Sequence, residues 1–432
     1  MTEATSRSTF ASSWGTILST AGVAIGLGNI WRFPYMMGQH GGALFLVAYL
    51  LIAIAFGLPG LMAEWSLARH TRRGTLGAFE RAGLPGGRYV SYLLLLTVLM
   101  ASSYYGVVVG WVLYFAVHFG LDVVSIETSG SFESLSTNFS VQAISLVAVS
   151  SICAGVLYLG VHRGIERLSR WGLPVFFVVL AVLMVRALTL PGAWEGTLEY
   201  LKPNWDQFTR TTPLAAMGQV FFSFGLGGTF MLAYGSYMRN DEDIPRAAVF
   251  TAGADVMAAL MAGLVVIPAA LAFGLPTRSG PALMFEVMPA VFEHMPAGAV
   301  FGLMFFGSIF IVALLSQMAA FEVVVSAITD STKWARKRSV IAVALVSTTL
   351  AIPALLSVDY VEFSDFIWGS TMQPVGGLLA VIAFAWYVNM GDALSEMRRS
   401  SRLPVPTWLF HWIRVGVPVG IVSTLVFSWV EG

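Results

Sequence analysis

Two glycine-rich stretches interrupt apolar runs and could bind an ion or a small solute. One lies within residues 11–37 and the other within residues 213–238. The glycines concerned are Gly22, Gly26, Gly28, Gly225, Gly227 and Gly228. Glycine costs about 1 kcal/mol relative to alanine inside a helix, so we expect unwound backbone here. At membrane depth, unwound carbonyls and amides persist only where protein, an ion or a solute satisfies them.

Charged side chains also fall inside apolar runs, among them Arg32, Glu64, Asp255 and Asp365; Glu322 lies in the run 297–329 and is assigned no role. Such charges are costly in hydrocarbon unless they are paired, hydrated or functional. We expect Arg32 and Asp365 to pair on the outer side, Glu64 to bond unwound backbone, and Asp255 to be either structural or a ligand. No histidine–carboxylate metal set and no serine–histidine arrangement accompanies them, so the pattern does not predict an enzyme.

Composition places this chemistry in a membrane. The chain has 432 residues, of which 57% are hydrophobic and 11% charged. Soluble domains carry about 25% charged residues. The formal net charge is zero, which gives no basic surface for nucleic acid. The single cysteine, Cys153, excludes a disulfide within the chain.

The apolar runs predict an all-α polytopic membrane protein. A helix needs about 20 apolar residues to cross the hydrocarbon core. Eleven such spans are predicted near 11–37, 42–69, 89–119, 139–159, 170–190, 213–238, 247–274, 297–329, 339–357, 361–389 and 408–430. Residues 275–296 contain four prolines and are expected to form a loop with short helical pieces.

The basic residues predict the orientation. With the N-terminus inside, 18 of the 24 Lys and Arg residues fall in inner segments and 4 in outer ones. Positively charged loops stay cytoplasmic. We therefore expect a multi-pass protein of the cytoplasmic (inner) membrane with a cytoplasmic N-terminus. An odd number of spans then places the C-terminus outside.

The two interrupted spans are the first and the sixth. Because they are five spans apart, the second half would run inverted relative to the first. Interrupted spans at matching places in two halves indicate a transporter's binding site. We expect one transporter domain over residues 1–432, with repeats over 11–190 and 213–389 and an additional helix over 408–430.

Four stretches resemble one known family. GVAIGLGNIWRFPYMMGQHGGALFLVAYLL strongly resembles the first-helix signature of the neurotransmitter:sodium symporters, and RGIERLSRWGLPVFF, GQVFFSFGLGG and YGSYMRNDEDI match further family motifs. The resemblance runs from about residue 7 to the end of the last span and is to the prokaryotic, eleven-helix members. It implies two inverted five-helix repeats with a central site between helices one, three, six and eight, sodium coupling and alternating access.

The resemblance also implies ligands for one or two sodium ions. The first would be held by the Ala24 carbonyl, Asn29, Ser223 and Asp255, and the second by carbonyls of Gly22, Ile25 and Val312 with the hydroxyl of Ser316. Leu315 stands where the family usually has a side-chain oxygen, which puts the second ion in question. The family's chloride site would lie near Tyr49, Gln219 and Ser223. Since the Asp255 carboxylate can replace the anion, we expect no chloride requirement.

The substrate implied is a small amino acid or a similar solute. Gly26 stands where the monoamine transporters of the family carry an aspartate, so the substrate is expected to bring its own carboxylate to the half-helix at Leu27 and Gly28. The expected lining is Val23, Ala24, Leu27, Gly28, Ala101, Tyr105, Phe222, Ser223, Gly225, Gly228, Ser316 and Ala320.

These small lining residues favour a neutral, hydrophobic or aromatic α-amino acid. Gly225 and the Ser316–Gln317 pair also resemble carriers of ω-amino acids such as GABA, β-alanine and taurine, so that alternative stays open. A proton-coupled carrier on the same fold and a sensor that binds without transport stay open as well. The sequence indicates no obligatory protein partner.

Gates are implied on both sides of the site. Arg32 and Asp365 would bridge on the outer side, above a lid made by Phe222 and Tyr105. On the inner side, Arg7, Asp330 and Tyr237 would hold the protein closed, with Phe10 where the family commonly has tryptophan.

Overall fold

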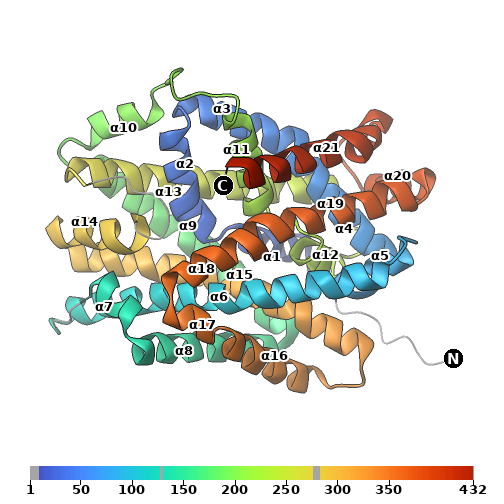
Figure 1. Cartoon of the computed structure of the whole chain (residues 1–432), viewed down its shortest axis with the longest axis horizontal. Coiled ribbons are helices and arrows are strands. Elements are labelled where there is room, and N and C mark those ends of the chain that lie inside the picture. The colour runs from blue at the N-terminus through green and yellow to red at the C-terminus, as the bar shows by residue number, and fades with distance from the viewer. Residues whose placement is uncertain (1–8, 127–129, 276–282, 432) are drawn as a thin grey trace.

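The computed structural model describes residues 9–126, 130–275 and 283–431 (Figure 1). Those ranges are mainly helical and contain no strand. Arg7, expected at the inner gate, lies outside them. The elements up to residue 201 are α1 (Ser13–Ala24), η1 (Gly28–Arg32), α2 (Phe33–Gln39), α3 (Ala43–Ile52), η2 (Ala53–Gly57), α4 (Leu58–Thr71), α5 (Thr75–Arg81), α6 (Gly87–Val123), α7 (Phe132–Thr137), α8 (Phe139–Tyr158), η3 (Val161–Glu166), α9 (Arg167–Leu188) and α10 (Ala193–Leu201).

The second part of the chain repeats this pattern of long helices and short connecting helices. Its elements are α11 (Thr212–Ser223), α12 (Phe230–Gly235), α13 (Ile244–Ala272), η4 (Leu283–Val287), α14 (Met288–His294), α15 (Gly298–Ser331), α16 (Arg336–Leu350), α17 (Ile352–Leu356), α18 (Val358–Ser364), η5 (Asp365–Thr371), α19 (Met372–Ile382), η6 (Ala383–Tyr387), α20 (Met390–Arg398) and α21 (Thr407–Glu431).

Eight helices of the described residues are long and apolar enough to cross a membrane. The other three of the eleven predicted spans are present as interrupted helices. They are α1 with η1 and α2, α11 with α12, and α16 with α17. A criterion based on the length of continuous helices therefore misses three spans, because each is divided into helices too short to cross a bilayer.

Several boundaries and short helices differ from the sequence-based expectation. The fifth span begins with η3 at Val161, well before residue 170. Helices α5, α7, α10 and α20 connect spans and were not predicted. They are six to nine residues long, so their apolar runs are too short to stand out from loops.

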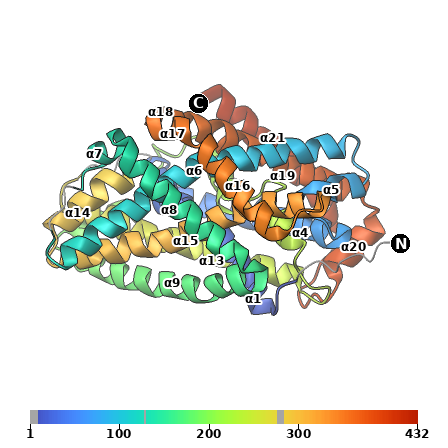
Figure 2. The same ribbon diagram turned by 90° about the horizontal axis from the view of Figure 1, so that it is seen from below.

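The long helices α6 and α15 pass side by side through the centre of the molecule (Figures 1 and 2). The broken helix α1 packs against α13, α9 and α15. The break in α1 lies between the two longest helices of the described residues, because a Cβ on Gly26 would lie 3.2 Å from Ser316 Oγ of α15 and 3.5 Å from the Tyr105 hydroxyl of α6.

Both breaks fall at the predicted glycines. Helix α1 ends at Ala24, Ile25 is extended with φ −72° and ψ 115°, and helical structure resumes at Gly28. Between α11 and α12 the chain passes Gly225 and Gly228, each with φ +62°. L-residues rarely adopt that left-handed conformation, so glycine is required at both positions.

The fully buried Glu64 satisfies the second break. Its Oε1 accepts hydrogen bonds from the backbone N–H groups of Gly227 and Gly228, both at 2.9 Å. The prediction that Glu64 bonds unwound backbone is confirmed. A side chain of α4 thus replaces the missing helical acceptors of the sixth span.

Glu64→Ala is expected to lower the melting temperature of the detergent-solubilised protein. Each buried amide left without an acceptor costs about 1–3 kcal/mol. The matched control is Glu199→Ala on the exposed face of α10. Equal melting temperatures for the two variants would contradict the role given to Glu64.

Candidate binding site

A cavity of about 390 Å³ lies where the two helix breaks meet α6 and α15. Every predicted lining residue except Gly228 borders it. Gly228 was assigned wrongly. Its amide points to Glu64, and a Cβ there would meet the Gly376 carbonyl rather than the cavity.

Three helices bring polar groups together around Asp255 of α13. The Asn29 Nδ2 donates to Asp255 Oδ1 at 2.8 Å and to Ser223 Oγ at 3.0 Å. The Ser223 hydroxyl contacts both Asp255 oxygens at 2.8 Å, and the Tyr49 hydroxyl donates to Oδ2 at 3.3 Å. Three of the four residues expected around the first sodium therefore converge, although the Asn29 Oδ1 accepts the Gly26 N–H at 2.9 Å. Ala24, the fourth, ends α1 beside the same cavity.

The Asp255 carboxylate is fully buried and has only neutral partners in the described part of the chain. No arginine, lysine or histidine of those residues pairs with it. An isolated buried carboxylate is strongly disfavoured, and it is stabilised by a bound cation or by a proton. The site can therefore attract a small cation. Gln219, also expected nearby, reaches the Gly28 carbonyl at 3.5 Å instead.

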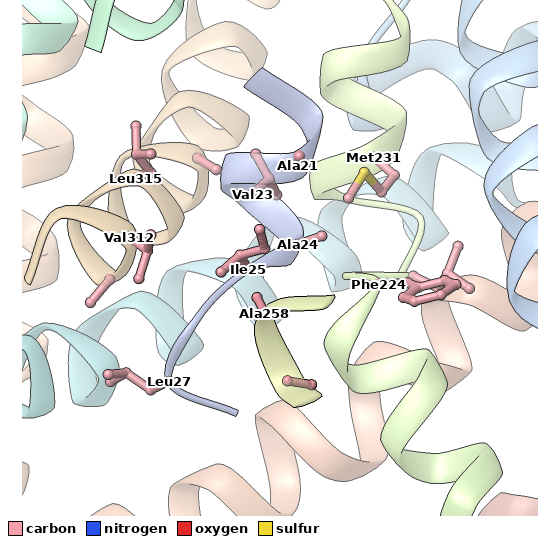
Figure 3. Packing of buried hydrophobic residues seen from close by; sticks show 14 of the residues in the cluster. Ala21, Val23, Ala24, Ile25, Leu27, Phe224, Met231, Ala258, Val312 and Leu315 are labelled. Atoms are coloured by element: carbon pink, nitrogen blue, oxygen red, sulfur yellow. The ribbon is translucent and has the colours of Figure 1, made fainter. Parts of the chain in front are cut away.

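A second group of oxygens surrounds Ser316 of α15. Its hydroxyl lies 3.3 Å from the carbonyl oxygens of Val23, Ile25 and Val312. Leu315 is buried and faces the same end of α1, as Figure 3 shows. Its Cδ1 would lie 2.9 Å from a Cβ built on Gly22. Two of the three expected carbonyls, those of Ile25 and Val312, therefore lie beside Ser316, and Val23 takes the place expected for Gly22. Leu315 contributes methyl groups where the family usually has a side-chain oxygen.

The gap in α1 forms the end of the cavity that could receive a carboxylate. A Cβ on Gly26 would lie 3.2 Å from Ser316 Oγ and 3.5 Å from the Tyr105 hydroxyl. The Tyr105 hydroxyl also interacts with the Leu27 backbone N–H. The resumed helix η1–α2 presents its N-terminus to this space, and helix N-termini attract anions. An aspartate at position 26 would fill it, so Gly26 keeps it open.

Sequence reasoning missed several cavity-lining residues. They include Ser102, Tyr104, Val108, Phe230 and Gln317. Gln317 was noted only for its likeness to ω-amino acid carriers. Nothing in the sequence indicated which face of α6 or α15 these residues occupy.

The expected outer bridge is not formed in the described structure. Arg32 and Asp365 both line the cavity, yet no direct ion pair joins them. The Arg32 guanidinium lies 4.8 Å from the Phe222 ring centroid, and Asp365 accepts a 2.8 Å hydrogen bond from the Tyr104 hydroxyl. The two charges therefore face the same opening with separate partners.

The opposite end is closed by an aromatic and ionic cluster. The buried Phe10 packs on Tyr234 and Tyr237, with ring centroids 6.0 and 6.1 Å apart. The Tyr237 hydroxyl donates to Glu322 Oε1 at 2.6 Å, and Arg336 makes a two-point pair with Glu322 at 2.9 and 2.5 Å. Asp330, expected here, lies in the last turn of α15. The sequence analysis gave Glu322 and Arg336 no role because they lie on separate elements.

Comparison with known proteins decides the family. The family model described as "Sodium:neurotransmitter symporter family" matches residues 7–124 and 118–431. The chain belongs to this family. An uncharacterized sodium-dependent transporter of Bacillus subtilis is 30% identical over 96% of each chain. A second one, of Haemophilus influenzae, is 27% identical over 97% of this chain and 98% of its own.

A solved structure agrees with the assignment. The crystal structure of MhsT in complex with L-phenylalanine matches this symporter with a TM-score of 0.87 and 31% identity, over 98% of this chain and 100% of MhsT. The predicted fold class is thereby confirmed as two inverted five-helix repeats, with interrupted first and sixth helices and an eleventh helix. The symporter is a sodium-dependent, multi-pass membrane transporter of a small molecule, and not an enzyme.

Proposed function

We propose that this symporter imports a neutral α-amino acid together with sodium by alternating access. The observation that carries the proposal is the Asp255 carboxylate, which is buried beside Asn29 and Ser223 without a cationic partner in the described residues. Hard cations prefer oxygen ligands, which Asp255 and Ser223 supply here. Asn29 turns its Nδ2 to Asp255 and accepts the Gly26 N–H with its Oδ1 at 2.9 Å. Sodium would neutralise the buried charge beside the substrate.

The same carboxylate supports chloride independence. Asp255 accepts hydrogen bonds from the Tyr49 and Ser223 hydroxyls, two of the three groups expected around chloride. The Asp255 carboxylate already accepts hydrogen bonds from these hydroxyls, so they are not free to bind chloride. Its negative charge can also balance a bound sodium ion, so no chloride is required for that purpose.

The substrate carboxylate would occupy the gap beside Gly26. There it meets the Tyr105 hydroxyl and the N-terminus of η1. Crystals of MhsT contain L-phenylalanine, an α-amino acid with an apolar side chain. Val23, Ala101 and Ala320 line this cavity with apolar groups as well, which favours a neutral side chain.

The open and closed ends support an outward-facing arrangement. The cavity extends past Arg32 to Tyr35, Glu362 and Gln373, whereas the Phe10 cluster closes the other end. If the protein lies in the inner membrane with its N-terminus cytoplasmic and its C-terminus external, the open end of the cavity faces the outside of the cell. Sodium would favour this state by its higher affinity for it. During transport the two repeats would move relative to each other. They comprise residues 11–190 and 213–389, and the additional helix at 408–430 belongs to neither.

Sodium would bind more weakly at the Ser316 cluster than at Asp255. The Ser316 cluster holds three carbonyls and one hydroxyl but no charge, and Leu315 withholds a further oxygen. Affinity for hard cations rises with the number and charge of the oxygen ligands. Coupling by one ion at the Asp255 site follows as the simplest stoichiometry.

Leu315→Thr is expected to raise the apparent sodium affinity for substrate binding by roughly fivefold, which corresponds to about 1 kcal/mol for one added oxygen partner. A sodium titration of substrate binding measures it. The matched control is Leu303→Thr, which lies on α15 away from the cavity. An unchanged sodium dependence in Leu315→Thr would contradict a second cation position at Ser316.

The proposal is tested by binding of radiolabelled leucine, phenylalanine, tryptophan, tyrosine, glycine, GABA and taurine to the purified protein in sodium or choline. Parallel samples replace chloride with gluconate. Neutral α-amino acids should bind in sodium only, and equally tightly with chloride or gluconate.

Asn29→Ala should weaken sodium-dependent substrate binding about tenfold, because it removes a side chain that orients Asp255 and Ser223. Asn240→Ala, on an exposed connection, serves as the control.

Other outcomes would replace this function with a stated alternative. Sodium-dependent binding of GABA or taurine alone would indicate an ω-amino acid carrier. Equal binding in sodium and choline, with affinity that changes with pH, would indicate that a proton neutralises Asp255 and that the carrier is proton-coupled.

A further inference from the structure

An apolar groove lies on the outer surface of the molecule and shares no lining residue with the binding cavity. It has a volume of about 500 Å³ and runs between α13 and the span formed by α3, η2 and α4. Both spans are long and apolar enough to cross a membrane. The side chains of Ile54, Val249 and Met257 in its wall are exposed. The groove therefore opens to the hydrocarbon around the protein.

The groove is long and narrow, and its wall is made only of aliphatic residues, methionine and glycine. Its lining on α13 runs from Val249 to Leu264, which is roughly 22 Å along the helix axis. A helix of that length and about 10 Å across would occupy roughly 1,700 Å³, so a second helix does not fit inside. Water would find no hydrogen-bond partner there. A single hydrocarbon chain is the occupant that suits this shape.

A cation lies at one end of the groove. Arg246, Val249 and Gly253 follow one another at spacings of three and four residues on α13, which places them on one side of the helix. Because α13 begins at Ile244, Arg246 lies in its first turn, close to the membrane surface. Arginine lays its apolar stem along such a helix and keeps its charged group in the interface.

The Arg246 guanidinium has no carboxylate partner among the residues that the structure describes. Its Cζ lies 5.5 Å from the centroid of the Phe250 ring, and Asp243 accepts only the backbone N–H of Arg246, at 3.0 Å. The exposed Phe250 packs edge-on against the exposed Trp14, with ring centroids 5.9 Å apart. Tryptophan is typical of the membrane interface. A negative charge in that interface can therefore pair with Arg246.

We propose that an anionic phospholipid binds here, with one acyl chain in the groove and its phosphate at Arg246. The occupant must combine a long hydrocarbon chain with a negative charge at one end, and this lipid has both. Arginine binds phosphate through two parallel N–H groups. A zwitterionic lipid presents the same phosphate beside a cation of its own, so it binds more weakly. The inference does not depend on the substrate or the coupling ion.

Native mass spectrometry of the delipidated, detergent-solubilised protein tests the headgroup contact. Phosphatidylglycerol and phosphatidylcholine with identical acyl chains are titrated separately. Wild-type protein should bind phosphatidylglycerol about fivefold more tightly, the effect of one arginine near an anionic surface. Arg246→Gln should bring the ratio of affinities close to one. The matched control is Arg88→Gln, which removes an arginine that lies over Tyr92 in the first turn of α6 and should leave the ratio unchanged.

A second pair of variants tests the acyl chain. A Cβ on the exposed Gly253 would meet nothing within 4 Å, so a phenylalanine ring at that position can fill the groove. Gly253→Phe should weaken the binding of both lipids about tenfold, because fewer chain carbons would then be buried. Gly155→Phe is the control, since Gly155 is also exposed and faces open space, on α8. It should leave the binding of both lipids unchanged.

Equal wild-type affinities for the two lipids would overturn the proposal, and this result needs no variant to fold. An unchanged ratio in Arg246→Gln, or an equal loss in Arg88→Gln, would also overturn it, because phosphatidylglycerol would then bind elsewhere or without a defined site. A protein dimer that Gly253→Phe dissociates, with lipid binding unaffected, would show that a second copy of the chain covers the groove instead.

Discussion

The need to satisfy backbone polar groups within hydrocarbon governs this structure. Two spans give up helical hydrogen bonds at mid-length, and every freed amide or carbonyl must find a partner there. Glu64 supplies one such partner for the amides of Gly227 and Gly228. The break in α1 leaves carbonyls beside Ser316 and an open helix N-terminus beside Gly26. The binding site is built from what these breaks leave free.

Buried charge completes the site in two different ways. Glu322 is neutralised by Arg336 and anchors Tyr237, so it helps close the end opposite the cavity's opening without any ligand. Asp255 has no such cation in the described residues and instead collects neutral donors from three helices. The first arrangement is complete in the protein alone. The second is complete only with a cation or a proton, which is what a coupled carrier requires.

The sequence predicts which helices are interrupted and form the site better than it predicts the side-chain contacts within the site. Glycine spacing located both breaks, and the placement of Asp255 in an apolar run marked it as a group needing a partner. Gly228 was misplaced because spacing does not tell whether a glycine's amide points to a cavity or to a buried acid. Glu322 and Arg336 were given no role because their contacts depend on helix rotation and on neighbours elsewhere in the sequence. Rotation is set by packing, which apolar periodicity describes poorly when helices are apolar all round.

Accumulation in sealed proteoliposomes tests the central claim most directly. Purified protein would be reconstituted with equal pH on both sides and the membrane potential clamped at zero, and uptake of labelled tyrosine would be followed with and without an inward sodium gradient. The account predicts that tyrosine rises transiently above its external concentration only when the gradient is imposed. Uptake that merely equilibrates and is the same in choline, or binding without uptake, would contradict it.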